Sequence, residues 1–276
     1  MTEPTNVGFS AADLADTGQW RLIALISEEG MTACLRHSRA QAAPPAILFS
    51  NHWQDNGNNL LQKIENTVYD NPRLLDDYAT EVIIQTPKAL FVPSLLLDEI
   101  GIEEDLLGSV YPAEAEDIFT DNAHGMASED KESCIYTLTP GLPAFLQRTL
   151  PGARISCHLS VLIEKFRHHT SEHTRIYADI RQKGADILAF NGKNLLSASV
   201  QPWESTADIA YRILLLMKSY NLGAENVEIR LSGLSDIKTE LANILRKMIG
   251  YVVFNPEPSS VTEMGLPLPL AISLEK

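Results

Sequence analysis

The sequence predicts an α/β protein of two lobes, each lobe a mixed β-sheet flanked by helices. Its length of 276 residues, with 45% apolar and 21% charged residues, suits a globular chain of one large domain or two lobes. Short apolar runs typical of strands alternate with stretches in which apolar residues recur at helical spacing. Both halves of the chain open with the same order of elements: three strands, a helix and a strand.

In the first half, an apolar run on each side of the turn at residues 28–30 predicts a hairpin. A helix follows, with apolar residues at positions 60, 61, 64 and 68. It is expected to end before Asn71-Pro72, because the residue before a proline is pushed out of the helical region. The strands expected here are residues 20–27, 31–37, 46–52 and 81–85, with an apolar segment at 90–97.

The second half contains the strongest turn signal of the chain, Asn191-Gly192, which predicts a hairpin with a type I′ turn. Ser205 and Asp208 have the spacing of a capping box and predict the start of a helix. Its body, residues 209–220, is apolar nearly all round and is therefore expected to be deeply buried. The strands expected here are residues 135–139, 154–157, 175–181, 186–190, 195–201, 227–231 and 251–254.

Three more helices complete the second half. Two are expected at residues 141–150 and 159–166. Asp236 is predicted to cap the third, and Gly250 is predicted to end it. A proline-rich stretch and a short apolar end, residues 270–274, follow the last strand.

We expect three regions along the chain. Residues 1–18 form a flexible N-terminal arm, residues 19–134 the first lobe, and residues 135–276 the second lobe. The first lobe includes an acidic loop at 113–132, where seven acidic residues accompany a single base, Lys131. A solvated loop is the favoured interpretation, with a cation site or an interaction surface as alternatives.

The charge and the cysteines exclude several classes of function. A net charge of −14 argues against binding to nucleic acid or to an anionic membrane surface. The three cysteines show no CxxC spacing, so neither a disulfide framework nor a thiolate zinc site is expected. With neither a signal peptide nor a run of apolar residues long enough to span a bilayer, we expect a cytoplasmic protein without membrane insertion.

Several segments in this order of elements resemble a known fold. They are 91–97 (FVPSLLL), 136–140 (YTLTP), 151–155 (PGARI), 178–193 (ADIRQKGADILAFNGK), 231–236 (LSGLSD) and 253–256 (VFNP). The chain is similar to the actin-like ATPases, which have a two-lobed, ribonuclease H-like fold, and within them to the PilM and FtsA branch. It looks like a member of a bacterial family of unknown function with this fold.

The resemblance implies a nucleotide site that this sequence only partly keeps. Actin-like ATPases hold Mg-nucleotide between two hairpins of the form Asp-x-Gly, whose glycines let backbone N–H groups approach the phosphates. The first hairpin here has Glu28 and Glu29 instead. The second keeps Asp179 and Gly184, but Arg181, Gln182 and Lys183 replace its small residues. The glycine pair on the adenosine side is reduced to Gly233.

The candidate vestigial nucleotide-binding residues are therefore Asp179, Arg181, Lys183, Gly184 and Gly233, and no catalytic residue is assigned. For Asp179 the alternative is an ordinary polar residue of a strand, and for Gly233 a tight strand-to-helix turn. Neither ATP nor Mg²⁺ is expected to bind, although both stay possible ligands.

The segment 169–173, HTSEH, matches the H-x-x-E-H zinc signature. That chemistry needs both histidines on one face of a continuous helix. Thr170 and Ser171 are poor helix formers and a strand follows closely, so a helix-to-strand turn is favoured and no metal is expected.

These observations favour a non-catalytic binding or scaffold protein, a pseudo-ATPase that keeps the fold for shape and interaction. Its expected partner is another protein, with self-association as a possibility. The alternative function is a noncanonical nucleotide-binding ATPase or phosphotransferase that uses Asp179 with Lys183 or Arg181. A zinc hydrolase that uses the HTSEH segment is the remote alternative.

Overall fold

The computed structural model describes residues 16–38, 45–54, 57–98, 101–111, 117–122, 132–167 and 173–276. Most of the predicted N-terminal arm lies outside these ranges. The described chain begins with a 3₁₀ turn, η1 (Thr17–Gln19), that leads directly into the first strand.

The first sheet has five strands in the order β3-β2-β1-β4-β8. Strands β1, β2 and β3 are antiparallel neighbours, whereas β4 runs parallel to β1, and β8 parallel to β4. The strands are β1 (Trp20–Ser27), β2 (Gly30–His37), β3 (Ala46–His52), β4 (Ala79–Gln85) and β8 (Arg154–Cys157).

The second sheet repeats this plan in the order β11-β10-β9-β12-β13. Its first three strands are again antiparallel, and its last two again run parallel to the central strand. The repeat that the order of elements predicted is therefore present in the hydrogen bonding. The strands are β9 (Thr174–Ile180), β10 (Ala185–Asn191), β11 (Asn194–Gln201), β12 (Val227–Gly233) and β13 (Tyr251–Phe254).

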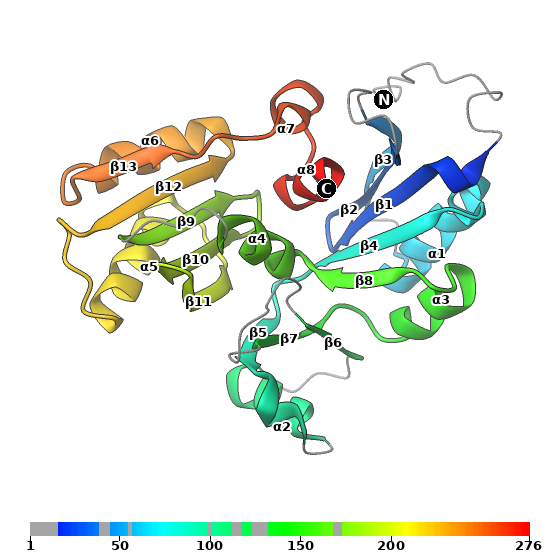
Figure 1. Cartoon of the computed structure of the whole chain (residues 1–276), viewed down its shortest axis with the longest axis horizontal. Helices are drawn as coiled ribbons and strands as arrows, with labels where there is room; N and C mark the ends of the chain where they lie inside the picture. The colour runs from blue at the N-terminus through cyan, green and yellow to red at the C-terminus, as the bar shows by residue number, and fades with distance from the viewer. Residues whose placement is uncertain are drawn as a thin grey trace.

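Helices cover both sheets, and α4 and α8 lie between them (Figure 1). Near the first sheet lie α1 (Leu60–Asp70), η2 (Pro72–Leu75) and α3 (Leu142–Thr149). The remaining helices of the two lobes are α4 (His158–Arg167), α5 (Thr206–Ser219), α6 (Ser235–Leu245), α7 (Ser259–Met264) and α8 (Leu268–Glu275).

The central strand of the second sheet is buried on both faces. Ile176, Ala178 and Ile180 belong to the core under α5 and α6, whereas Tyr177 stacks on Phe166 of α4 with ring centroids 4.0 Å apart. Successive side chains of a strand point to opposite faces, so this alternation places α4 on the face opposite α5 and α6. Helix α4 thus joins the core of the second sheet to that of the first.

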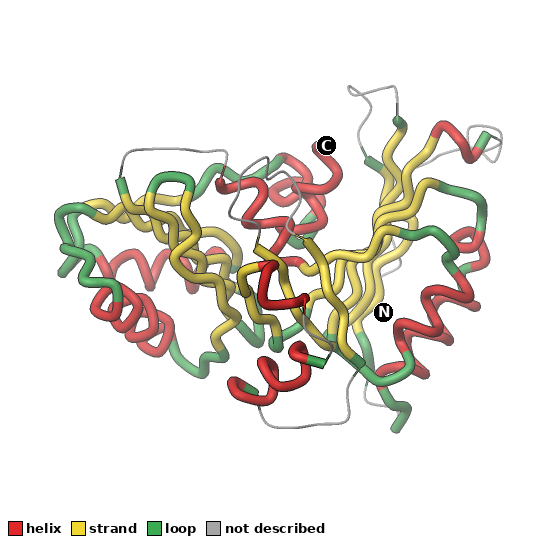
Figure 2. The backbone as a smooth tube through the Cα atoms, turned by 60° about the horizontal axis from the view of Figure 1, so that its bottom comes forward, coloured by secondary structure: helices red, strands yellow, loops and turns green. Residues whose placement is uncertain are grey.

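A third, three-stranded sheet in the order β5-β7-β6 lies below the two lobes (Figures 1 and 2). Between β5 and β6 come a short 3₁₀ helix and α2. The second lobe has no counterpart, since only α6 lies between β12 and β13. The elements are β5 (Ala89–Pro93), η3 (Ser94–Asp98), α2 (Ile102–Val110), β6 (Ile118–Asn122) and β7 (Glu132–Thr137).

The hydrogen bonding of the sheets does not follow the predicted boundary between residues 134 and 135. Strand β8 pairs with β4, and α8 packs on β1 and α4, so parts of the expected second lobe belong to the first sheet and its core. Ion pairs hold the end of α8 on α4: Lys165 to Glu275 at 2.9 Å and Lys276 to Glu164 at 2.6 Å. The apolar pattern of a segment predicts that the segment is buried, but it does not indicate in which of the two cores.

Much of the predicted acidic loop lies outside the described residues, but the part that the structure describes is not a solvated loop. Residues 118–122 form strand β6, and the Oδ2 atom of buried Asp121 accepts the N–H of Cys157 at 2.7 Å. Asp117 accepts the N–H of Gly141 at 2.6 Å. Glu132 pairs with Arg167 at 2.7 Å. These three acids connect the third sheet to the rest of the chain.

Four local predictions need correction. Gly192 has positive φ but Lys193 does not, which is typical of a type II′ hairpin rather than type I′. Helix α5 is not buried all round, because Tyr211 is 61% exposed on its outer face. Asp236 lies inside α6 rather than capping it, since the N-cap is Leu234. The same helix ends at Leu245, before Gly250 is reached.

The capping box at Ser205 is confirmed: the carboxylate of Asp208 accepts the N–H and the hydroxyl of Ser205 at 2.8 and 2.9 Å. The apolar C-terminal stretch forms helix α8, whose residues 268–274 are all buried.

We predict that Leu270→Ala, in α8, lowers the free energy of unfolding by about 2–5 kcal/mol, because the buried side chain would leave a cavity. Urea denaturation followed by circular dichroism measures this change. The matched control is Leu215→Ala on the exposed face of α5, which should cost less than about 1 kcal/mol. Equal losses in the two variants would show that α8 is not part of the core.

Candidate functional site

Each lobe presents one hairpin at the end of its central strand. In the first lobe the tip is Glu28-Glu29, and Ser27 Oγ accepts the N–H groups of Glu29 and Gly30 at 3.1 Å each. In the second lobe the tip is residues 181–184, closed by the N–H of Arg181 donating to the carbonyl of Gly184 at 2.9 Å. These are the two hairpins in which the resemblance to actin-like ATPases implies phosphate-binding loops.

A tryptophan supports each hairpin in the same way. The indole N–H of Trp53, just after β3, donates to the carbonyl of Ser27 at 2.9 Å. The indole N–H of Trp203, just after β11, donates to the carbonyl of Arg181 at 3.0 Å. The two residues therefore occupy equivalent places in the two lobes.

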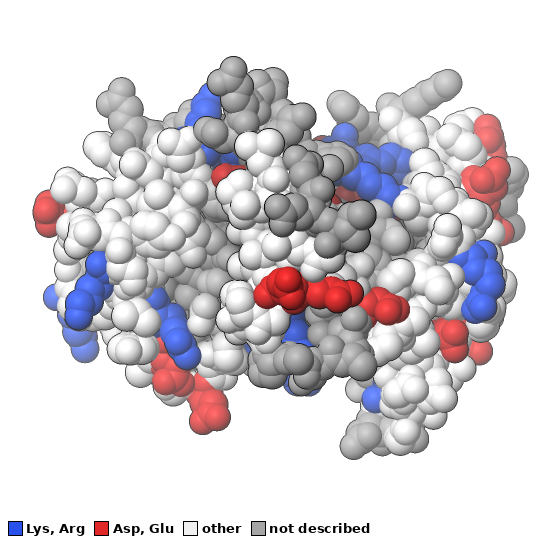
Figure 3. Space-filling view, turned by 90° about the horizontal axis from the view of Figure 1, so that it is seen from below, with Lys and Arg blue, Asp and Glu red and all other residues white. Residues whose placement is uncertain are grey.

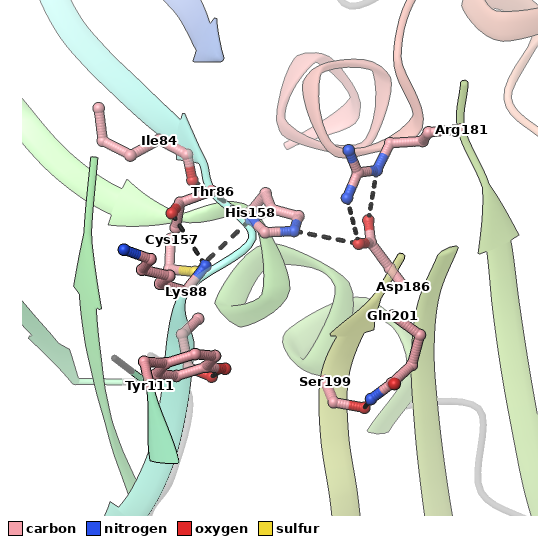
Figure 4. A network of polar contacts seen from close by, with 11 residues as sticks. Ile84, Thr86, Lys88, Tyr111, Cys157, His158, Arg181, Asp186, Ser199 and Gln201 are labelled. Atoms are coloured by element: carbon pink, nitrogen blue, oxygen red, sulfur yellow. Dashed lines mark hydrogen bonds and ion pairs between the residues drawn. The ribbon is translucent and has the colours of Figure 1, made fainter. Parts of the chain in front are cut away.

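A buried charge network connects the second hairpin to α4 (Figure 4). Arg181 binds the carboxylate of Asp186 through two nitrogens: Nε to Oδ2 at 3.0 Å and Nη2 to Oδ1 at 2.5 Å. The same Oδ1 lies 3.3 Å from Nε2 of His158, the first residue of α4. Asp186 and His158 are both completely buried, so their interaction is not screened by water.

His158 also contacts the first lobe. Its Nδ1 lies 3.3 Å from the carbonyl oxygen of Ile84 in β4 and 3.6 Å from Sγ of Cys157. One imidazole therefore contacts both β4 of the first sheet and β10 of the second sheet. His158 is the first residue of α4, so these contacts position the start of that helix against both lobes.

The charges of the network shift its pKa values in opposite directions. Burial alone would lower the pKa of His158, but the Asp186 carboxylate and Cys157 outweigh it and raise that pKa to about 9. Burial alone would raise the pKa of Asp186, yet Arg181 and His158 hold it well below the usual range. The carboxylate is therefore ionised, and His158 carries a proton at neutral pH.

Asp179 lies directly opposite Asp186 in the pairing of β9 with β10. Burial, and then the charge of Asp186, raise the pKa of Asp179 to about 6, although Ser232 donates a hydrogen bond to it. Within the described chain, Oδ1 of Asp179 has no hydrogen-bond partner. Two buried carboxylates thus face each other, and only Asp186 is neutralised by a bidentate arginine.

The two hairpins approach each other across the space between the lobes. Burial alone would lower the pKa of the Arg181 guanidinium, but Asp186 raises it, and Asp179 and Glu29 add to the rise. Glu29 belongs to the tip of the first hairpin. A carboxylate of the first lobe is therefore within electrostatic range of the network in the second.

Gly233 packs too closely on the neighbouring strand for any side chain. It has a φ of +91°, and a Cβ atom there would lie 2.1 Å from the carbonyl oxygen of Ile180. Its N–H donates to Oε1 of Glu257 at 3.0 Å, and the ammonium of Lys238 binds the same oxygen at 2.9 Å. Glu257 thus occupies a place where a ligand's anionic group could bind.

The structure brings four of the five candidate residues together at one end of the second sheet. Asp179 and Arg181 belong to one network, Gly184 closes the hairpin, and Gly233 pairs with Ile180 between them. Lys183, by contrast, is exposed at the tip.

Sequence reasoning missed three residues of this site: His158, Asp186 and Glu257. A signal existed for two of them, because each is a polar residue inside an apolar run, in CHLSVLI and ADILAF. Glu257 lies in a proline-rich stretch without any such pattern.

Residues 169–172 of the HTSEH segment, the basis of the zinc hypothesis, lie outside the described residues. Elsewhere, no group of three His, Cys, Asp or Glu residues is placed to hold a metal ion. Within the same described ranges, no helix is both long and apolar enough to cross a membrane.

Two lobes of identical strand order, each presenting a hairpin to the space between them, define the actin-like ATPase fold, and this chain has that fold. A family model described as "Protein of unknown function (DUF3822)" matches residues 10–252, and the chain belongs to this family. The resemblance and the fold class that the sequence predicted are confirmed.

Solved structures agree with this fold. A Bacteroides thetaiotaomicron protein with an actin-like ATPase fold and unknown function superposes with a TM-score of 0.80 at 21% identity, covering 96% of this chain and 98% of that one. The PilM-PilN type IV pilus biogenesis complex matches with a TM-score of 0.57 at 12% identity, covering 94% and 98%. No curated protein matches the chain in sequence.

We predict that Asp179→Asn stabilises the protein above pH 6, because it removes the cost of ionising a buried carboxyl group. The folded pKa is about 6, above the ordinary 3.8, so this cost appears as the pH rises from 4 to 6. At pH 8 the gain should approach roughly 3 kcal/mol, at 1.4 kcal/mol per pKa unit.

The measurement is urea denaturation at pH 4.5 and pH 8, with exposed Asp236→Asn as the control. A variant less stable than the wild type at pH 8 would contradict the prediction.

We also predict a loss of stability at alkaline pH that depends on His158. Its folded pKa is about 9, above the ordinary 6.5, so its stabilising contribution is complete below pH 6.5 and disappears as the pH rises through 9. The free energy of unfolding should fall across this range by up to about 3 kcal/mol more in the wild type than in His158→Gln.

Denaturation curves at pH 6, 7.5 and 9 measure this difference, and His52→Gln on exposed β3 is the control. Parallel pH profiles for the wild type and His158→Gln would rule out a charged imidazole in the network.

Proposed function

We propose that this protein is a non-catalytic binding or scaffold protein, a pseudo-ATPase that keeps the actin-like fold for shape and interaction. The observation that carries the proposal is the engagement of Arg181 by Asp186. A phosphate group needs positive charge and free N–H donors. Here the partly buried guanidinium of the second hairpin is already bound at two atoms by an ionised carboxylate.

The other places for phosphate are occupied in the same way. The N–H of Gly30 in the first hairpin donates to Ser27 Oγ, and the tip carries Glu28 and Glu29. The N–H of Gly233 donates to Glu257, which also engages Lys238. A triphosphate would have to displace these internal partners and approach several carboxylates, at a substantial desolvation and repulsion cost.

A role without catalysis needs a partner, and we infer that the partner is another protein. The similar PilM structure is part of a pilus biogenesis complex, so one protein with this fold works as a member of an assembly. Self-association of this chain is a second possibility. The net charge of −14 disfavours nucleic acid and anionic membrane surfaces as partners, and a cytoplasmic location fits the proposal.

One observation favours the alternative, a noncanonical nucleotide-binding phosphotransferase. Asp179 is buried, its Oδ1 has no hydrogen-bond partner among the described residues, and its pKa is raised to about 6. These are properties of a general base. Lys183, exposed at the hairpin tip, could then contact an incoming phosphate, with Arg181 as its neighbour. The neutralisation of Arg181 weighs against this alternative.

We predict that neither ATP nor ADP, at 5 mM with or without Mg²⁺, changes the melting temperature by more than about 1 °C. A bound nucleotide at 100 times its Kd would stabilise the fold by about 2.7 kcal/mol. For a chain of this size that means a rise of roughly 5–10 °C. Differential scanning fluorimetry separates these outcomes.

The control is Asp179→Ala titrated with the same ligands. A rise of several degrees in the wild type that disappears in Asp179→Ala would refute the pseudo-ATPase proposal and support the phosphotransferase.

A further inference from the structure

The negative charge of the chain is concentrated in one segment. Residues 98–132 contain twelve acidic residues and one lysine, a net charge of −11 out of −14 for the whole chain. In contrast, residues 173–276 contain eleven acidic and eleven basic residues. The charged segment runs from the end of η3 through α2 and β6 to the start of β7. Among the described residues, this segment carries Glu103, Glu104 and Asp105 on α2, and Asp117, Asp121 and Glu132 on or beside the strands of the third sheet.

The same part exposes large apolar side chains. Leu95 of η3 is 81% exposed, more than any other large hydrophobic residue of the described chain, and Leu96 beside it is 48% exposed. Val110 at the end of α2 is 55% exposed. The two helices contact each other, and together they cover a small core of Val92, Leu107 and Ile135. We call Leu95, Leu96 and Val110, with the helices that carry them, the η3–α2 face.

Acidic side chains accompany this face. Glu103, Glu104 and Asp105 form the first turn of α2. In the view from below, toward which α2 projects, a row of acidic side chains crosses the middle of the molecule (Figure 3). Apolar groups beside a strong negative potential form a surface of mixed character.

Local stability explains only part of this arrangement. Acidic residues in the first turn of a helix interact favourably with its dipole, which accounts for the kind of residue at 103–105. It accounts neither for a leucine that is 81% exposed nor for a net charge of −11 within 35 residues. The duplicated plan of the two lobes does not require the third sheet either, since the second lobe lacks it.

We propose that the η3–α2 face docks a basic, amphipathic segment of a partner protein. The apolar side of that segment would cover Leu95, Leu96 and Val110, and its Lys or Arg side chains would meet Glu103, Glu104 and Asp105. This inference rests on the proposed binding role and specifies its surface and the chemistry of its partner.

Charge decides between the possible occupants. A second copy docked through the same face would bring two sets of Glu103, Glu104 and Asp105 together, which charge repulsion disfavours. Nucleic acids and anionic lipids carry the same sign and are disfavoured too. A cationic protein segment gains both the apolar contact and the complementary potential, which speeds association and selects against other partners.

The test uses a fluorescein-labelled 18-residue helix of Leu and Lys, with leucines at positions i, i+3, i+4 and i+7. Its affinity for the full-length protein is measured by fluorescence anisotropy at 50 and 300 mM NaCl. The comparison peptide has the same composition with its leucines scrambled around the helix. We expect the amphipathic peptide to bind at least about tenfold more tightly than the scrambled one, and more weakly at the higher salt concentration.

Two sets of variants locate the binding. The apolar variant Leu95→Ser/Leu96→Ser should weaken binding about tenfold or more. Its control, Tyr211→Ser/Leu215→Ser on the exposed face of α5, should change it less than about twofold. The charge variant E103Q/E104Q/D105N should weaken binding severalfold at 50 mM NaCl. Its control, E204Q/E225Q/D236N, removes the same number of acidic groups from the surface of the second lobe.

Three outcomes overturn the proposal: no binding at 50 mM NaCl, equal affinity for the two peptides, or equal effects of the test and control variants. Equal effects of the test and control variants would show that the net charge of the protein alone attracts the peptide. All the substituted residues are exposed except half-buried Glu103, and far-UV spectra of the variants check their folding. None of these outcomes affects the nucleotide titration, so this surface can fail while the pseudo-ATPase proposal stands.

Discussion

The relation between the two lobes depends on the contacts of one buried carboxylate, that of Asp186. It binds the guanidinium of Arg181 at two atoms and the imidazole of His158 at a third contact. His158 in turn reaches the backbone of Ile84 in the other lobe. Removing one partner from such a network would leave an unpaired charge away from water, which is much more costly than losing a surface ion pair. The network therefore couples the second hairpin to the packing of α4.

The same network is the basis of the proposal that this protein keeps the fold without the nucleotide chemistry. In an actin-like fold the hairpins are available for phosphate only if their donors and charges stay free. Here internal carboxylates engage Arg181, Gly233 and Lys238. The indoles of Trp53 and Trp203 then support the two hairpins in corresponding positions. Both hairpins are present, and the donors beside the second one bind carboxylates of the chain itself.

The third sheet stands apart from this symmetric plan. It interrupts the first lobe, and three of its acidic residues, Asp117, Asp121 and Glu132, have partners within the fold. Glu103, Glu104 and Asp105 of α2 add negative charge to the same part of the fold, which also exposes Leu95 and Leu96. Stability alone favours covering leucines and spreading like charges. A surface that exposes leucines and gathers acidic residues is better explained by binding to a partner than by the stability of the fold.

The sequence by itself determined the fold class, most strands and helices, and the equivalence of the two halves, because these depend on local periodicity and turn chemistry. The Ser205 capping box is one example, since its partners are three residues apart. Only the tertiary structure decided that β8 and α8 join the first core, and that His158, Asp186 and Glu257 belong to the site. Those contacts join residues 24–192 positions apart, for which a single sequence carries no local signal. Asp179 and Gly233 were found because a motif marked them, whereas the partners that change their chemistry are brought together only by folding.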